Sequence, residues 1–263
     1  MSPASEQPRS VFVRSQVVEA AVELFGERGF ESTSVDDLAR AAGMSRSTYF
    51  RQVGGKEDAV FADHPPLIEE LGAWMDGELG DGAGDGRPAD PWATVCAASE
   101  RVFAHLSADL DLARRRYTEV RAVRALRDRE IITERGYERL FSDYLRRNVP
   151  GLELVEAIGF AALVTATHNH FLRQAVRTES SEPAEQVRDR HAADLDRALV
   201  RVRLRFGVGA EGGQGAGDDA GPAASSAQVL VASFPVTMPS GEVLRRVRDA
   251  LGSGDEERTT GQS

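Results

Sequence analysis

Apolar residues recur with a helical period along most of the chain. The first stripe occupies positions i, i+1, i+4, i+7 and i+8, which form one face of a helix. Its members are Val17, Val18, Ala21, Leu24 and Phe25. Gly29 follows as a C-cap that ends this helix. Because strand-like alternation is missing before residue 207, the pattern predicts an all-α body.

Two short helices are predicted next, at residues 34–42 and 45–53. Gly43 lies between them, and two helices joined by a short Gly-containing turn make a helix-turn-helix. The start of the first short helix has a capping-box pattern. The residues of that pattern are Thr33, Ser34, Asp36 and Asp37.

A fourth helix is expected to open at Lys56 and to meet an obstacle at Pro65 and Pro66. Proline removes a backbone donor and clashes with the preceding turn, so we expect a kink or a restart there. Asp63 or His64 would cap the part that continues to about residue 79.

The rest of the body is expected to be helical. Further helices are predicted at 91–106, 109–126, 127–148, 152–177 and 183–206. Gly- and Asp-rich composition predicts a loop at 80–90 and a flexible linker beyond 206. An apolar strand (228–234) and a short amphipathic helix (240–251) follow the linker. The expected divisions are a helix-turn-helix domain at 9–63, an all-helical domain at 64–206, a linker at 207–226 and a tail of unknown role at 227–252.

Charge and cysteine content limit the classes of protein. The formal net charge of −10 argues against a protein that coats nucleic acid non-specifically, but not against one local DNA-binding face. Cys96 is the single cysteine, which excludes an intrachain disulfide and fits a reducing cytoplasm. It is expected to be a small buried hydrophobe, with a reactive thiol as the alternative. No secretory or membrane-spanning segment is seen, so a soluble cytoplasmic protein is expected.

The second helix of the pair is the element expected to enter a DNA major groove. Met44, Tyr49 and Val53 would pack inward. The outward or marginal residues are Arg46, Ser47, Thr48, Phe50, Arg51 and Gln52. Arg46 suits guanine and Gln52 suits adenine, while the hydroxyls of Ser45, Ser47 and Thr48 suit phosphates or bases. Lys56 at a helix N-terminus would bind a phosphate. The alternative is that Arg46 and Arg51 are solvated surface cations.

Residues 14–63 resemble the N-terminal domain of TetR-family transcriptional regulators. The matching motifs are A-x-x-L-F-x-x-x-G-[FY] (21–30), T-[TS]-V-x-x-[IL]-A (33–39), A-G-[VM]-S (42–45), T-[LYF]-[YF] (48–50) and K-E (56–57). The resemblance implies an all-α homodimer. It places DNA contacts on Thr33, Ser34, Arg46, Ser47, Thr48, Phe50, Gln52 and Lys56. The chain departs from the family pattern at Gln52, Val53 and Gly55, which bears on the operator sequence.

The resemblance also implies that helices 152–177 and 183–206 pair with a second subunit as a four-helix bundle. A stripe of small or apolar residues suits such packing. Its members are Ile158, Ala161, Ala162, Thr165 and Asn169. The alternative is that this stripe belongs to the core of a single chain.

Residues 115–145 faintly resemble regulators that bind acyl-CoA-like ligands. The side chains expected near a pocket are Trp74, Trp92, Phe103, His105, Tyr117, Arg121, His168 and Phe171. Each of them can instead be an ordinary core or surface residue. His168 and His170 face different sides of a helix, so no metal site is expected. No catalytic constellation is seen, and neither an enzyme nor a cofactor is expected.

The sequence therefore predicts a ligand-responsive repressor that binds a palindromic double-stranded DNA operator as a dimer. An effector would tilt the fourth helix, with the Pro65-Pro66 break setting where the motion is transmitted. One alternative is an activator or a ligand-independent regulator. Another is an all-α small-molecule binding protein without a DNA role.

Overall fold

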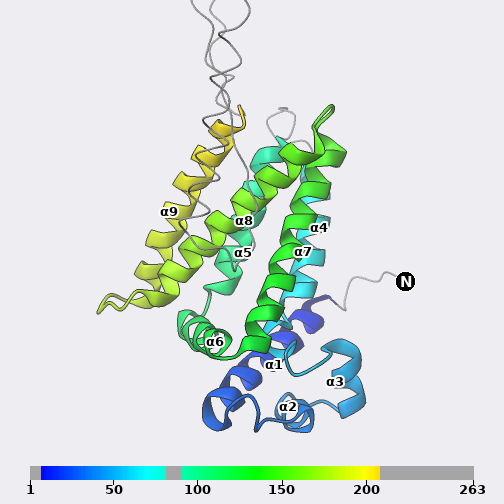
Figure 1. Cartoon of the computed structure of the whole chain (residues 1–263), viewed down its shortest axis with the longest axis vertical. Coiled ribbons are helices and arrows are strands. Elements are labelled where there is room, and N and C mark those ends of the chain that lie inside the picture. Colours follow the sequence, from blue (N-terminus) through cyan, green and yellow to red (C-terminus); the bar gives the residue numbers. More distant parts are fainter. Residues whose placement is uncertain (1–6, 81–89, 208–263) are drawn as a thin grey trace, which may run out of the picture. The chain divides into compact units, whose positions relative to one another are not determined.

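A computed structural model of the chain describes residues 7–80 and 90–207, with the side chains of 14–78 and 90–207 (Figure 1). Every regular element in these ranges is helical, which confirms the expected all-α fold. The helices are α1 (Gln7–Arg28), α2 (Val35–Ala41), α3 (Arg46–Gln52), the 3-10 helix η1 (Ala59–Phe61), α4 (His64–Gly80), α5 (Pro91–Leu106), α6 (Leu110–Ala122), α7 (Arg124–Asn148), α8 (Leu154–Arg177) and α9 (Ala184–Arg205). The expected strand and tail helix lie outside the described residues.

Helices α1, α2 and α3 and η1 share one hydrophobic cluster, which we call the head core. Phe25, Leu38 and Tyr49 are fully buried in it, one from each of the three α-helices. Tyr49 is the inward residue that the sequence predicts for α3, while Met44 and Val53 pack against the cluster as partly buried side chains. The predicted inward face of the helix-turn-helix is confirmed.

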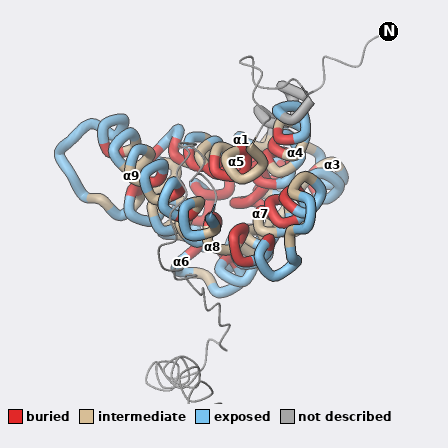
Figure 2. The backbone as a smooth tube through the Cα atoms, turned by 90° about the horizontal axis from the view of Figure 1, so that it is seen from above, coloured by how far each residue is buried: buried red, intermediate tan, exposed pale blue. Residues whose placement is uncertain are grey.

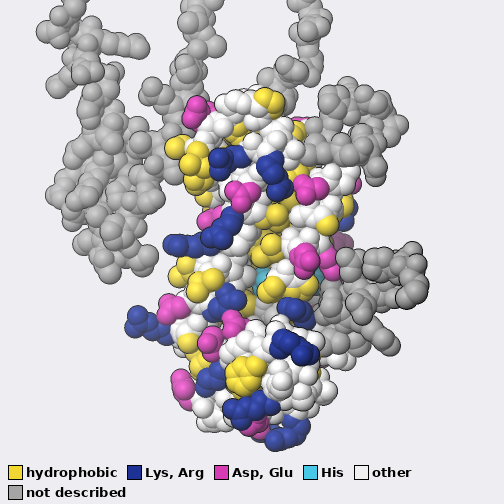
Figure 3. All heavy atoms as spheres, turned by 90° about the vertical axis from the view of Figure 1, so that its right-hand side faces the viewer, with side chains coloured by type: hydrophobic (Ala, Val, Ile, Leu, Met, Phe, Trp, Pro, Cys, Tyr) yellow, Lys and Arg dark blue, Asp and Glu magenta, His cyan; other side chains and the backbone are white. Residues whose placement is uncertain are grey.

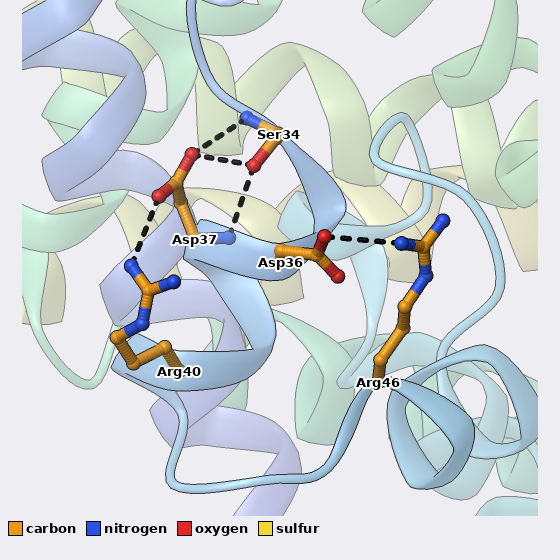
Figure 4. A network of polar contacts seen from close by, with 5 residues as sticks. All are labelled: Ser34, Asp36, Asp37, Arg40 and Arg46. Carbon is orange, nitrogen blue, oxygen red and sulfur yellow. Dashed lines mark hydrogen bonds and ion pairs between the residues drawn. The ribbon is translucent and has the colours of Figure 1, made fainter.

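The turns of the head follow from local sequence signals. Gly29 has φ +81° and Gly43 has φ +65°, a region where glycine lacks the steric penalty of other residues. Ser34 caps α2 through a capping box with Asp37: the Asp37 N–H donates to Ser34 Oγ at 3.2 Å, and the Ser34 N–H donates to Asp37 Oδ2 at 3.1 Å (Figure 4). Both the glycine breaks and this cap are as predicted.

The expectation of a helix opening at Lys56 is wrong. Residues 55–58 form a turn that leads into η1, and α4 begins at His64. Pro65 and Pro66 therefore lie in the first turn of α4, where backbone N–H groups have no intrahelical partner and proline costs little. The prolines mark a new helix start, and of the two predicted outcomes the restart is the one observed.

The break between α6 and α7 falls at Val123, whose backbone is extended (φ −107°, ψ 123°), and not at 126–127 as the sequence pattern suggests. The reason is packing across the corner. Val120 and Leu126 are buried members of the head core, and Val123 packs against it. The α6–α7 corner thus completes the hydrophobic interior of the head.

The remaining helices enclose a second and larger core. Helices α8 and α9 pack on each other, and α5 and α7 pack against them (Figures 1 and 2). Cys96 lies buried in this core, and burial raises the pKa of its thiol to about 12. The expectation of a small buried hydrophobe is confirmed, because so high a pKa keeps the thiol protonated and unreactive.

Candidate nucleic-acid interface and effector cavity

Helix α3 presents its polar face to solvent. Tyr49 anchors it from below, and its hydroxyl reaches the Gly55 carbonyl at 3.5 Å. Arg46, Ser47, Arg51 and Gln52 are exposed on the outer side. Phe50 is also outward, with 48% of its surface accessible, which is unusual for a phenylalanine. An exposed polar helix rigidly seated on a small core is what major-groove reading requires.

Arg46 is held by two neighbours in this structure. Its Nη1 donates to Asp36 Oδ2 on α2 at 3.0 Å (Figure 4). Its guanidinium also lies 5.6 Å from the centre of the Phe50 ring. Both groups of the ion pair are exposed. An exposed pair is worth only about 0–1 kcal/mol, so Arg46 can exchange this carboxylate for a base edge or a phosphate at little cost.

Three of the predicted hydroxyl contacts have structural partners. Thr33 is 2% exposed, its Oγ1 donates to the Gly29 carbonyl at 2.9 Å, and its N–H donates to the Phe30 carbonyl at 3.3 Å, so both donors are used within the chain. Ser45 caps α3, since its Oγ accepts from the Thr48 N–H at 3.1 Å. The Ser45 and Thr48 hydroxyls are also bonded to each other at 2.8 Å. These residues fix the start of α3 whatever else they contact.

Lys56 is placed differently from the expectation. It does not stand at a helix N-terminus. Its Nζ donates to the Phe30 carbonyl at 3.0 Å and lies 4.1 Å from the centre of the Phe30 ring. The ammonium is also 3.7 Å from Glu31 Oε2. Lys56, the only lysine of the sequence, therefore connects the turn after α3 to the α1–α2 turn through contacts within the chain.

The helix-turn-helix segment differs in charge from the chain as a whole. Residues 33–56 carry four Arg or Lys against two Asp, although the full chain has a net charge of −10. Figure 3 shows Arg and Lys side chains gathered over the lower end of the face it presents, the end where α2 and α3 lie in Figure 1. A local cationic face on an acidic protein suits binding to one DNA site better than coating of nucleic acid.

A cavity of about 120 Å³ lies among α4, α5, α6, α7 and α8. Its walls are largely apolar, with Val102, Leu106, Phe141 and Leu172 among the lining residues. Its polar lining comes from Ser99, His64, Arg116, Tyr117, Glu130, Thr133, Glu134, Tyr137, Thr165, His168, Asn169 and Arg173. A largely apolar wall that also carries polar side chains is typical of small-molecule sites.

A buried polar cluster joins this cavity to the start of α4. Asp63 accepts two hydrogen bonds from Arg116, each 3.1 Å long, and has His105 Nε2 at 3.6 Å. Burial alone would raise the pKa of Asp63, but the Arg116 guanidinium and the neighbouring histidines hold it well below its usual range. His64 Nδ1 is bonded to the Tyr137 hydroxyl at 2.7 Å, and burial lowers the pKa of His64 to about 3.

Only two of the side chains predicted from the sequence to lie near a pocket line the cavity, namely Tyr117 and His168. The other sequence candidates serve elsewhere. Phe103 is a core residue, Trp74 packs under the guanidinium of Arg101, and Trp92 packs on Phe160. His105 faces Asp63, Arg121 is bonded to the Tyr117 hydroxyl, and Phe171 makes an edge-to-face contact with His170. The type and spacing of side chains along a helix therefore do not predict which face of that helix lines a cavity.

Four further residues line the cavity although the sequence did not indicate it, namely Ser99, Arg116, Tyr137 and Thr165. Ser99 sits among alanines, and Arg116 is one of three consecutive arginines. Their importance comes from partners distant in the sequence, as Asp63 and Arg116 are 53 residues apart. No local pattern carries that information.

An exposed apolar patch lies where α8 starts and α9 ends. Leu154, Val155 and Ile158 on α8 are 50, 73 and 51% exposed, and Val200 and Leu204 on α9 are 46 and 56% exposed. The two helices are antiparallel neighbours, so these ends lie together (Figure 1). We call these five residues the α8–α9 patch.

The dimer stripe predicted on α8 is largely an intrachain feature. Ala161 and Thr165 are buried within the chain, and Asn169 is bonded to Glu134 at 2.8 Å. Of that stripe, Ile158 alone is exposed, at 51%, and it belongs to the α8–α9 patch. The alternative, that the stripe is core, is therefore the better description of most of it.

Within residues 7–80 and 90–207, no group of three His, Cys, Asp or Glu side chains is arranged to hold a metal ion. Among the helices that the structure describes, none is both long and apolar enough to cross a membrane.

The N-terminal part of the chain is similar in sequence to known proteins. Residues 17–62 match the model of a family described as "Bacterial regulatory proteins, tetR family". This part of the chain, which contains the helix-turn-helix, is therefore similar to that family of regulators. A protein described as a candidate mycofactocin biosynthesis transcriptional regulator, MftR, from Mycobacterium tuberculosis is 38% identical over 60 residues. That match spans 23% of this chain and 30% of MftR.

Solved structures of TetR-family proteins are also similar. NalD, the secondary repressor of the MexAB-OprM multidrug efflux pump in Pseudomonas aeruginosa, has a TM-score of 0.45 at 19% identity, covering 73% of this chain and 96% of its own. FadR of Thermus thermophilus, a transcriptional repressor in complex with lauroyl-CoA, has a TM-score of 0.45 at 20% identity, covering 78% of this chain and 100% of its own.

Proposed function

We propose that the protein is a sequence-specific DNA-binding transcriptional regulator that acts in the cytoplasm as a ligand-responsive repressor. The single observation that carries this proposal is the geometry of α3. The helix is anchored by Tyr49 on the head core, capped by Ser45, and exposes Arg46, Arg51 and Gln52 to solvent. The family match over residues 17–62 supports the same role.

The recognition chemistry would come from a few side chains. Arg46 would leave Asp36 and donate a bidentate pair to guanine O6 and N7, and Gln52 would pair with adenine. The hydroxyl of Ser47 and the guanidinium of Arg51 would reach phosphate oxygens. Phe50, exposed beside Arg46, would offer an apolar contact to a thymine methyl group.

A homodimer is the second part of the proposal. The α8–α9 patch exposes five large apolar side chains on two adjacent helices, which is the kind of surface that a second copy covers. Two symmetric copies would present two α3 helices, so the operator would be a palindrome with half-sites about 34–36 Å apart or a multiple of that distance.

Ligand control would act through the buried polar cluster. Arg116 on α6 both lines the cavity and holds Asp63 at the start of α4. An effector that moves α6 would therefore move the junction between body and head, which changes the spacing of the two α3 helices. The position of Pro65 and Pro66 in the first turn of α4 makes that junction a natural hinge. If an effector still releases DNA unchanged after Pro65→Ala and Pro66→Ala together, the hinge is excluded.

A gel shift with the DNA upstream of the protein's own gene tests the proposal. At low salt the full-length protein should shift this DNA as one cooperative species. Arg46→Ala should cost about 1–3 kcal/mol of operator affinity and relax base choice at one position. Arg139→Ala, an exposed arginine on α7, is the matched control and should bind like the parent.

Two results would overturn the proposal. One is the absence of any shift with upstream or genomic fragments at low salt. The other is equal affinity of the Arg46 and Arg139 variants. A reporter gene fused to the upstream DNA separates repression from activation, since deletion of the protein raises expression in the first case and lowers it in the second.

A further inference from the structure

Among the described residues, several Ser and Thr hydroxyls in or directly after a helix are satisfied by the carbonyl one turn earlier, whereas two buried hydroxyls have no partner at all. Six Ser and Thr side chains donate to the carbonyl four residues before them, at 2.6–3.1 Å, which is the usual way for a helical hydroxyl to be satisfied. They are Thr94, Ser107, Thr118, Thr133, Thr167 and Thr178. Ser99 Oγ and Thr165 Oγ1 are buried and have no hydrogen-bond partner among the described residues.

Both exceptions line the same cavity. Ser99 comes from α5 and is 1% exposed, and Thr165 comes from α8 and is 5% exposed. Buried polar groups without a partner are rare in folded proteins, because the lost hydration is not regained. Two such hydroxyls in one apolar hollow indicate that a bound molecule supplies the missing hydrogen bonds.

His168 adds a third polar group of defined character. Its Nδ1 lies 3.1 Å from the Ser99 carbonyl oxygen, which can only accept, so Nδ1 carries the proton. Burial lowers the pKa of His168 to about 4, and the ring is neutral at physiological pH. Its Nε2 is then a hydrogen-bond acceptor. The cavity thus combines one acceptor with two hydroxyls that can donate.

The charged lining residues are already matched with one another. Arg116 is bonded twice to Asp63. At the solvent side, Glu134 accepts from Arg173 at 3.2 Å and from Asn169 at 2.8 Å, and Glu130 lies 3.9 Å from Arg173. Glu130 and Glu134 share the one guanidinium of Arg173, so an anionic ligand would lose its hydration without finding a free counter-charge, which is costly in an apolar site.

The size of the cavity limits the ligand further. Its volume of about 120 Å³ is below the roughly 300 Å³ at which drug-sized sites begin. An apolar cavity of about 150 Å³ takes one benzene molecule. The cavity in this conformation of the protein therefore limits the ligand to about the size of a single ring.

We propose that the cavity binds an uncharged, ring-sized molecule with a hydroxyl group, which donates to His168 Nε2 and accepts from Ser99 and Thr165. This inference rests on the proposed ligand response and names the chemistry of the effector. It departs from the acyl-CoA-like ligand suggested by residues 115–145, because a highly anionic acyl-CoA meets no free cation in the lining.

Calorimetric titration of the full-length protein with four probes tests the ligand class. They are p-cresol (uncharged, with a hydroxyl), toluene (uncharged, without one), benzoate (anionic) and lauroyl-CoA (acyl-CoA). The expected result is saturable binding of p-cresol, at least about fivefold tighter than toluene, since one hydrogen bond is worth roughly that factor. Tighter binding of benzoate or lauroyl-CoA, or no binding of p-cresol, would overturn the proposal.

Matched threonines on α8 test the contact itself. Thr165→Val removes the unpaired hydroxyl and keeps the side-chain shape, so p-cresol affinity should fall about fivefold, toward that of toluene. Ser99→Ala should act in the same direction. Thr167→Val removes a hydroxyl that is bonded to the Leu163 carbonyl outside the cavity lining, and it should leave p-cresol affinity unchanged. Equal affinities of the Thr165 and Thr167 variants would refute the contact.

The parent protein and each variant are also tested for operator binding without probes. This measurement distinguishes failure of the proposed DNA binding from failure of the proposed ligand chemistry. Loss of the ligand result with an intact gel shift refutes only the effector chemistry. Intact probe binding without a gel shift refutes the DNA role and leaves the cavity assignment standing.

Discussion

Arg116 on α6 and Asp63 at the start of α4 form a buried, doubly hydrogen-bonded ion pair, with both N···O distances at 3.1 Å. Neither group can lose the other without leaving a charge in the protein interior. The pair also sets the position of α6 relative to the helix that leads out of the head. It therefore has a structural effect that can be measured apart from any ligand.

Arg116→Ala should lower the free energy of unfolding by roughly 3–5 kcal/mol, because it leaves the Asp63 carboxylate buried and unpaired. Urea unfolding followed by circular dichroism measures this loss. Arg147→Ala breaks the exposed pair with Asp76 and serves as the control, with a loss of at most about 1 kcal/mol. Similar losses in the two variants would show that the Arg116 pair is not stabilised by burial as described.

His168 makes stability depend on pH. Its pKa is about 4 in the folded protein and about 6.5 in an unfolded chain, so the unfolded state binds more protons between these values. The free energy of unfolding should therefore fall as pH drops from about 6.5 toward 4, with at most roughly 3 kcal/mol from this residue. His168→Gln should flatten the dependence in urea titrations across that range.

The control for this pH experiment is His170→Gln, which changes an exposed histidine on the same helix. A slope that is equally steep in both variants would mean that the buried ring of His168 is not the source of the effect.

Lys56→Met should destabilise the protein by roughly 1–3 kcal/mol, since the ammonium of Lys56 is bonded to the Phe30 carbonyl and lies over the Phe30 ring. Arg51→Met, at an exposed position on α3, should change stability by no more than about 0.5 kcal/mol. Urea unfolding compares the two. A Lys56 variant of full stability whose operator binding has lost about one unit of salt slope would instead assign Lys56 to a phosphate.

Val155→Glu together with Ile158→Glu should convert the proposed dimer to a monomer. Each contact occurs twice in a symmetric interface, and the dimer dissociation constant should rise by at least about a hundredfold. Sedimentation equilibrium measures the change. Ile131→Glu with Ile132→Glu alters an equally exposed apolar pair on α7 and should leave the dimer intact. If the α7 pair abolishes the dimer and the α8 pair does not, the α8–α9 patch is not the interface.

The features best predicted from the sequence are those that depend only on neighbouring residues, such as turns, helix caps and the buried face of a helix. Gly43, Ser34 with Asp37, and the spacing of Tyr49 specify the helix-turn-helix without help from distant residues, and the structure confirms each of them. The corner at Val123 could not be found in this way, because it depends on packing of Val120 and Leu126 into the head core.

The same distinction applies to the candidate sites. Outward residues of α3 follow from helical period alone, whereas the role of Lys56 depends on Phe30, 26 residues away. Ser99 and Thr165 carry no sequence signal, since a serine or threonine within a helix is ordinary. They stand out only when their missing hydrogen bonds are compared with those of Thr167 and its counterparts.

The burial of Val120 and Leu126 among the side chains of α1–α3 means that the first 63 residues do not hold a complete interior of their own. A truncated fragment that stops before α6 would expose the surface that this corner covers. Helices α1–α3 and the helices of the larger core should consequently unfold together in one cooperative transition. A destabilising substitution in the larger core should then also lower the proposed affinity for DNA, even where no ligand is present.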